Sequence, residues 1–121
     1  MRDWLHVEDH CAAIEAILLR GSTGRSYTVG GDAERSSLDV ARMILSAFHI
    51  AEADGLIFVA DRKGHDLRYA IDHTRITTEL GWHPRIPFAD GLKSTIDWYQ
   101  THASWWKPLL EKATLSHTPL P

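Results

Sequence analysis

The sequence contains one cysteine, no long apolar run and no excess of positive charge. Cys11 has no partner in the chain for a disulfide, which fits a reducing compartment. No apolar stretch approaches the ~20 residues of a membrane-spanning helix, and the first residues form no apolar signal core. A formal net charge of -3 argues against general binding to a nucleic-acid backbone. We therefore expect a soluble, cytoplasmic protein without nucleic-acid or membrane partners.

Several catalytic motifs are missing as well. The chain contains no G-x-G-x-x-G fingerprint and no Gly-x-Ser-x-Gly elbow. None of its tyrosines is followed four residues later by a lysine, so the Tyr-x-x-x-Lys pair is absent too. His6 and His10 have a spacing that suits one helix face, but no third ligand follows at a known spacing, so we expect no metal site.

What is present suits one globular domain. The 121 residues are 44% hydrophobic and 24% charged, which is ordinary for a soluble protein with a buried core. The clearest helical pattern begins at Glu8 and Asp9, whose carboxylates suit a helix N-terminus, and it should end at Gly21. Its apolar residues recur at helical spacing and should form one buried face, consisting of Cys11, Ile14, Ile17 and Leu18. Cys11 is accordingly expected to be a small buried residue.

Weaker signals predict the remaining elements. A second helix should begin near Leu38 with Ser36 or Ser37 as its N-cap. Further helical segments are expected over residues 74–80, from residue 88 or 89 onward, and near 105–110.

Extended segments should alternate with these helices. Residues 24–31 should form a strand, in which residues 26–29 are β-favouring, and the Gly30-Gly31 pair at its end allows a sharp turn or the close approach of another group. The continuous apolar run at 56–59 is typical of a buried strand, and residues 67–71 should be extended.

The polar run Asp61-Arg62-Lys63-Gly64-His65-Asp66 follows the predicted buried strand. Loops at strand ends often collect binding residues, but a solvated turn around a glycine explains the same run equally well. Guanidinium groups pair with phosphate through two hydrogen bonds, so Arg2 and Arg62 are candidates for a diphosphate site. Exposure on the surface is nevertheless the commoner situation for arginine. The residues alone leave both interpretations open.

Five motifs, in order and at compatible spacing over residues 2–110, resemble those of dTDP-glucose 4,6-dehydratases, which are extended short-chain dehydrogenase/reductase enzymes. They are RDWLHVEDH from Arg2, YTVGG from Tyr27, DRKGHDLRYAID from Asp61, ELGW from Glu79 and FADGLKSTIDWY from Phe88. The DRKGHD run is the specific one. The first and last motifs also occur, more loosely, in related sugar-nucleotide epimerases and decarboxylases.

The resemblance implies an α/β fold, namely the C-terminal fragment of a Rossmann-type short-chain dehydrogenase. Residues 1–50 would be the end of the dinucleotide-binding domain, 51–113 the substrate-binding region and 114–121 a flexible tail. NAD is the cofactor that the resemblance implies. Because the family's NAD-binding and catalytic residues lie upstream of the matched segment, we expect none of them on this chain.

The resemblance does imply residues that hold the substrate. Arg2 and Arg62 match positions that grip the diphosphate of a dTDP-sugar, and the surrounding loop is matched by Asp61, Lys63, Gly64 and His65. Ser37 stands where the family usually has an asparagine that contacts substrate. Because serine lacks the reach of the amide, an N-cap role is the better interpretation of Ser37.

The implied function is therefore the nucleotide-sugar-binding portion of an NAD-dependent dTDP-glucose 4,6-dehydratase that is inactive alone. Its partner would be a complementary N-terminal half or a second copy in a homo-oligomer. One alternative is a non-catalytic remnant that serves as an interaction module, for example through Trp105-Trp106. Another is a piece of a related epimerase or decarboxylase, although the DRKGHD run argues against it.

Overall fold

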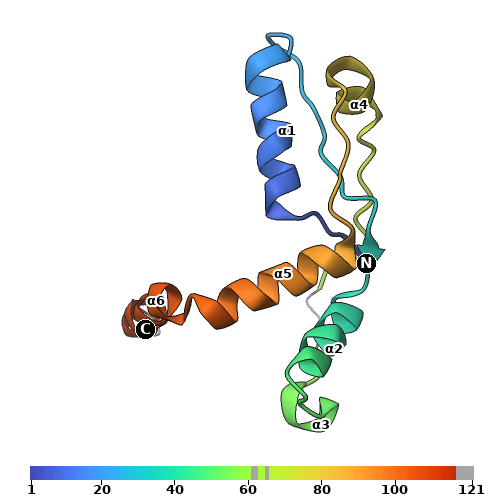
Figure 1. Ribbon diagram of the computed structural model, residues 1–121. Helices are drawn as coiled ribbons and strands as arrows, with labels where there is room; N and C mark the ends of the chain where they lie inside the picture. Colours follow the sequence, from blue (N-terminus) through green and yellow to red (C-terminus); the bar gives the residue numbers. More distant parts are fainter. Residues whose placement is uncertain (61–62, 65, 117–121) are drawn as a thin grey trace. The chain divides into compact units, whose positions relative to one another are not determined.

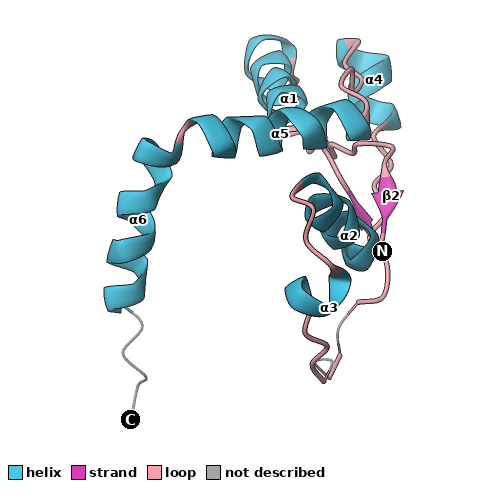
Figure 2. Cartoon of the chain, turned by 60° about the horizontal axis from the view of Figure 1, so that its bottom comes forward, coloured by secondary structure: helices cyan, strands magenta, loops and turns pink. Residues whose placement is uncertain are grey.

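The computed structural model describes residues 1–60, 63–64 and 66–116, with side chains described as far as residue 110 (Figures 1 and 2). It divides into two compact units, Met1–Phe88 and Ala89–Pro121, and each is described by itself. The elements of the first unit are β1 (Arg2–Asp3), α1 (Val7–Arg20), β2 (Glu34–Arg35), α2 (Ser37–Ala47), α3 (Glu52–Gly55) and α4 (Thr74–Leu80). α5 (Phe88–Thr101) begins at the last residue of this unit, and α6 (Ala103–Ser116) follows it.

The first predicted helix is confirmed as α1. His6 is its N-cap, and the Nδ1 atom of His6 accepts a hydrogen bond from the backbone N–H of Glu8 at 3.3 Å. Gly21 ends the helix and donates its own N–H to the carbonyl of Ile17 at 2.8 Å. Both ends lie within one residue of the prediction because capping signals are local in the sequence.

The buried face of α1 differs from the prediction. Its buried residues are Asp9, Ala13 and Ala16, whereas Cys11 is exposed and the side chain of Leu18 is 79% exposed. The two alanines let the partner helix α4 approach closely. A helix that is apolar on more than one side cannot signal by periodicity which side meets its neighbour. The expectation that Cys11 is buried is therefore wrong for the described structure.

The core of the first unit joins α1 to the segment around α4, which lies beside it in Figure 1. Ala13 and Ile76 are fully buried, and Leu80 and Trp82 complete the contact. The prediction of a helix over 74–80 is confirmed. Gly81 ends α4 with φ 70°, a left-handed conformation that glycine adopts without strain.

The predicted strands at 24–31 and 56–59 do not form within the described residues. The only sheet there is the two-stranded antiparallel pair of β1 and β2, in which Arg2 faces Arg35. Ile57 is 90% exposed, and the two residues after it, Phe58 and Val59, are 76% and 83% exposed, so the expectation of burial is wrong here. A strand needs a hydrogen-bonded neighbour, and no described residue supplies one for this run.

The second unit consists mainly of α5 and α6. The helix expected near 105–110 is confirmed and is longer than predicted. Two contacts join these helices: the rings of Trp98 and Trp105 have centroids 5.4 Å apart, and Trp106 donates its indole N–H to the carbonyl of Tyr99 at 2.7 Å. No helix in the described part of the chain is both long and apolar enough to cross a membrane.

Candidate functional site

Arg2 lies in β1, and its guanidinium contacts the last residue of the 61–66 loop and the segment that follows it. The guanidinium carbon sits 4.6 Å from the ring centroid of Tyr69, within the range of a cation–π contact. Its Nη1 atom donates to the carbonyl of Met1 at 2.8 Å and to that of Asp66 at 3.3 Å. The fold thereby joins two motifs through Arg2 and Asp66, which are 64 residues apart in the sequence.

The segment after the loop is attached to Met1, which precedes β1, and to β2. The N–H of Tyr69 donates to the carbonyl of Met1 at 3.1 Å, and its hydroxyl donates to Asp66 at 2.5 Å. Arg68 forms two hydrogen bonds of 2.7 Å to the carboxylate of Glu34 in β2. The hydrogen bonds from Arg68 hold the pKa of Glu34 below its ordinary value and raise the pKa of Arg68. The end of the loop is therefore fixed in position.

The candidate loop itself is only partly described. Asp61, Arg62 and His65 lie outside the described residues, so their predicted roles in binding stay predictions. Lys63 and Gly64 are exposed and form a turn, with Gly64 at φ 73°. These two residues agree with the expectation of a loop built around a glycine.

Ser37 is the first residue of α2 and is exposed. The N-cap of α2 is Ser36, whose hydroxyl oxygen accepts a hydrogen bond from the N–H of Asp39 at 3.0 Å. The interpretation of Ser37 as the cap is therefore wrong, because the residue with extended backbone lies one position earlier. Arg35 is the register partner of Arg2 and the last residue of β2. Ser37 lies two residues further along the chain, so it follows the end of β2 that faces Arg2.

The Gly30-Gly31 pair meets the prediction of close approach by another group. A Cβ atom at Gly31 would lie 1.9 Å from the carbonyl oxygen of Trp4. The carboxylate of Asp3 accepts hydrogen bonds from the N–H groups of Gly31 at 3.0 Å and Ala33 at 3.1 Å. These contacts attach residues 30–33 to β1 and the residues after it.

The same contacts show that the Gly30-Gly31 pair does not fit the phosphate loop of an NAD site. A dinucleotide site needs a glycine-rich loop whose backbone is open to a pyrophosphate at a helix N-terminus. Gly31 is closed by the Trp4 backbone, and a Cβ atom at Gly30 would lie 2.9 Å from the carbonyl oxygen of Ile71. The pair is thus occupied by the chain itself.

A groove beside the sheet is lined mainly by carboxylates, each of which is engaged by another group of the chain. Asp32 accepts from His73 at 2.9 Å, and Asp72 accepts from the N–H of Thr74 at 2.8 Å. The carboxylate of Asp3 accepts from the backbone of residues 31 and 33, and that of Glu34 accepts from Arg68. No group of three or more metal-ligating side chains is placed to hold an ion in the part of the chain that the structure describes. The lining residues are Asp3, Asp32, Glu34, Ala70, Ile71 and Asp72.

Sequence reasoning missed three residues that shape the site. Tyr69 supports Arg2, and Arg68 fastens the loop end to β2. Both residues belong to the DRKGHDLRYAID motif, so the motif could have indicated that they help to form the site. Arg35 faces Arg2 across the sheet, and its guanidinium carbon lies 4.8 Å from the ring centroid of Phe88. Nothing local in the sequence indicated that pairing.

The fold and these motifs define a class of protein. A family model described as GDP-mannose 4,6 dehydratase matches residues 1–95. The chain belongs to this family.

Within this class, the similar proteins are dTDP-glucose 4,6-dehydratases, so the resemblance seen in the motifs is confirmed. The enzyme of Streptomyces griseus is 47% identical over 115 residues, which are 95% of this chain and 35% of that protein. The enzyme of Mycolicibacterium smegmatis is 48% identical over 110 residues, covering 90% of this chain and 33% of the relative. The chain spans about a third of the length of the curated relatives it matches.

The similar solved structures are dTDP-glucose 4,6-dehydratases as well. The dTDP-glucose 4,6-dehydratase of Streptomyces venezuelae, solved with NAD bound, matches with a TM-score of 0.82 at 40% identity. That of Bacillus anthracis, in complex with NAD, matches with a TM-score of 0.80, also at 40% identity. Each comparison covers 88% of this chain and 33% of the other. The expectation that NAD is the cofactor of the family is thus confirmed for these relatives.

Proposed function

We propose that the chain is the nucleotide-sugar-binding portion of an NAD-dependent dTDP-glucose 4,6-dehydratase, which converts dTDP-glucose to dTDP-4-keto-6-deoxyglucose and water. In this proposal residues 1–50 end the dinucleotide-binding domain and 51–113 form the substrate region. The observation that supports it best is the contact of Arg2 with Asp66 and Tyr69. Arg2 thereby lies at the end of the loop that contains Arg62, the second candidate for holding the diphosphate.

The setting of Arg2 suits an anion. Stacking on Tyr69 and hydrogen bonds to two carbonyl oxygens restrict the guanidinium before a ligand arrives, so less side-chain freedom is lost on binding. Arg35 lies directly opposite in the sheet, and like charges in opposite positions repel each other. A bound diphosphate would offset this repulsion.

Replacing Arg2 by alanine should weaken the binding of dTDP to the chain by about tenfold, as expected for the loss of a charge-assisted pair. Titration calorimetry with dTDP measures the change. Arg25→Ala is the matched control, because it removes the same charge from an exposed residue with no side-chain contact to the site. Equal affinities for the two variants would contradict the proposal, and Arg62→Ala should behave like Arg2→Ala.

The purified chain should form no 4-keto-6-deoxy sugar from dTDP-glucose, even with NAD added. The physical reason is that the sequence contains no dinucleotide fingerprint and no Tyr-x-x-x-Lys pair. Chromatography of the reaction mixture against an intact dehydratase as positive control measures the product. Product formation by the chain alone would show that the assignment of the chain as a substrate-holding portion is wrong.

The alternative of a non-catalytic interaction module stays untested. Of the two adjacent tryptophans in α6, Trp105 is 62% exposed, whereas the indole of Trp106 is engaged with Tyr99. Retained dTDP binding that depends on Arg2 would favour the dehydratase portion over the module.

A further inference from the structure

The pair of strands β1 and β2 carries its charges in two groups, one on each face. Successive side chains of a strand point to opposite faces, and residues directly opposite in an antiparallel pair share a face. Arg2 and Arg35 are one such pair in the register, and Asp3 and Glu34 are the next. One face of the pair therefore presents two arginines, and the other face presents two carboxylates.

The carboxylates around the pair do not neutralise Arg35. Asp3 is engaged by backbone N–H groups, and Glu34 is engaged by another arginine. Asp39, in the first turn of α2, accepts a hydrogen bond from a serine hydroxyl at 2.6 Å. In the part of the chain that the structure describes, none of these carboxylates forms an ion pair with Arg35. The positive charge of Arg35 is therefore left to another partner.

The side chain of Arg35 is nevertheless held in position. Its guanidinium carbon lies 4.8 Å from the ring centroid of Phe88, which in turn meets the ring of Trp4 edge-on at 6.4 Å. The indole N–H of Trp4 donates to the carbonyl of Arg35 at 3.2 Å. A cation–π contact uses the flat face of a guanidinium and leaves the N–H donors at its edge. Within the described residues these donors of Arg35 form no hydrogen bond.

The other arginines of the described residues differ from Arg35. Only Arg2 shares the contact with an aromatic ring, and Arg25 is exposed and lies over no ring. Four further arginines donate from their guanidinium groups to acceptors of the chain itself. They are Arg20, Arg42, Arg68 and Arg75. Arg35 thus combines a fixed position with open donors, and it does so on the face that contains Arg2.

We propose that Arg35 determines specificity for a nucleoside diphosphate, by binding the phosphoryl group that Arg2 does not hold. The inference rests on the proposed function and adds the residue that distinguishes a diphosphate from a monophosphate. Side chains in directly opposite positions begin about 4.5–5.5 Å apart, so the two guanidinium groups can meet adjacent phosphoryl groups. A monophosphate offers one such group, and a single bidentate pair with Arg2 uses it.

Titration calorimetry of the full chain with dTDP and with dTMP tests this role. Arg35→Met keeps an unbranched side chain that can lie on Phe88, but it removes the charge and the donors. It should weaken dTDP binding by about tenfold and dTMP binding by less than about twofold. Arg35→Lys keeps the charge without the planar fork, so its dTDP affinity should lie between those of Arg35→Met and the unaltered chain. Arg25→Met is the matched control and should change neither affinity.

Urea denaturation separates this role from a purely structural one. Arg35→Met should unfold at the same urea concentration as the unaltered chain, because the contact with Phe88 is kept. Three results would each overturn the role of Arg35: an unchanged affinity for dTDP, an equal loss for dTDP and dTMP, or no recovery of dTDP binding in Arg35→Lys. A loss of dTDP binding that accompanies a loss of stability in Arg35→Met would assign the residue to the fold instead.

These outcomes are distinct from those that test the proposed function. If Arg2→Ala weakens dTDP binding and Arg35→Met does not, only the role of Arg35 is refuted. If the unaltered chain binds neither nucleotide, the proposed function and the role of Arg35 are both wrong.

Discussion

Replacing Gly31 by alanine is expected to lower the free energy of unfolding by about 3 kcal/mol, at the upper end of the usual cost of overpacking. The added Cβ would lie 1.9 Å from the Trp4 carbonyl oxygen, 2.7 Å from its carbonyl carbon and 3.1 Å from the Leu5 Cα. All three are backbone atoms, which cannot rotate away. Residue 31 would have to move, and its hydrogen bond to Asp3 would break with it.

Urea denaturation followed by circular dichroism measures this effect. Gly24→Ala is the matched control, because Gly24 has φ 79° but no atom within 4 Å of an added Cβ. It should therefore show only the conformational cost of about 1 kcal/mol. A Gly31→Ala variant no less stable than Gly24→Ala would mean that the close approach to Trp4 is absent in solution. Because β1 contains Arg2, Gly31→Ala should also impair dTDP binding.

Replacing Asp9 by alanine should cost about 3 kcal/mol of stability, because it leaves polar groups inside the fold without partners. Asp9 is buried, at 5% exposure, and its Oδ2 atom accepts from the N–H groups of Arg85 at 3.0 Å and Ile86 at 2.9 Å. These bonds join the first turn of α1 to the chain beyond α4. The indole N–H of Trp82 donates to the Asp9 carbonyl at 3.1 Å and strengthens the same junction.

The same denaturation experiment applies, with His10→Ala as its control. His10 is the next residue along α1 and is exposed, so its replacement should change stability by less than about 0.5 kcal/mol. Asp9→Asn keeps an acceptor oxygen and should lie between the two. If Asp9→Ala matched His10→Ala, the carboxylate would not be the junction that the structure indicates.

The helices were largely predictable from the sequence because their signals are local. Acidic residues at the start of α1, a serine before α2 and glycines after α1 and α4 act within one turn of the helix ends that they mark. The choice between Ser36 and Ser37 was the exception. Both residue types suit the position, and only the extended backbone at Ser36 identifies the cap.

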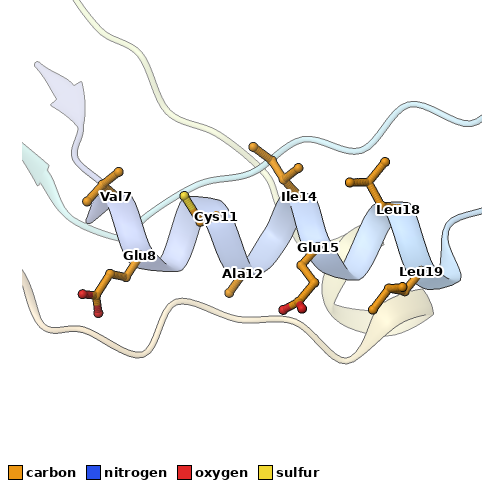
Figure 3. Close-up of a pocket in the computed structure, with 8 residues that line it drawn as sticks. All are labelled: Val7, Glu8, Cys11, Ala12, Ile14, Glu15, Leu18 and Leu19. Atoms are coloured by element: carbon orange, nitrogen blue, oxygen red, sulfur yellow. The ribbon is translucent and has the colours of Figure 1, made fainter.

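The strands were not predictable in the same way. The run at 56–59 has the composition of a buried strand, yet Ile57 is almost fully exposed in the described structure. Composition expresses a preference for a sheet, whereas a strand forms only where a neighbour accepts and donates its hydrogen bonds. Ile14 and Leu18 of α1 (Figure 3) are a similar case, because apolar side chains indicate burial without indicating which surface covers them.

The sequence by itself determined the family, the helix ends and the candidate binding residues, because motifs and capping signals are contiguous along the chain. Only the tertiary structure decided that Ala13 and Ala16, rather than Cys11 and Leu18, face the core. It also decided that Arg2 meets Asp66 and Tyr69. The physical reason is the same in both cases: a contact between distant segments depends on which surfaces are complementary in space, and no periodicity within one segment contains that information.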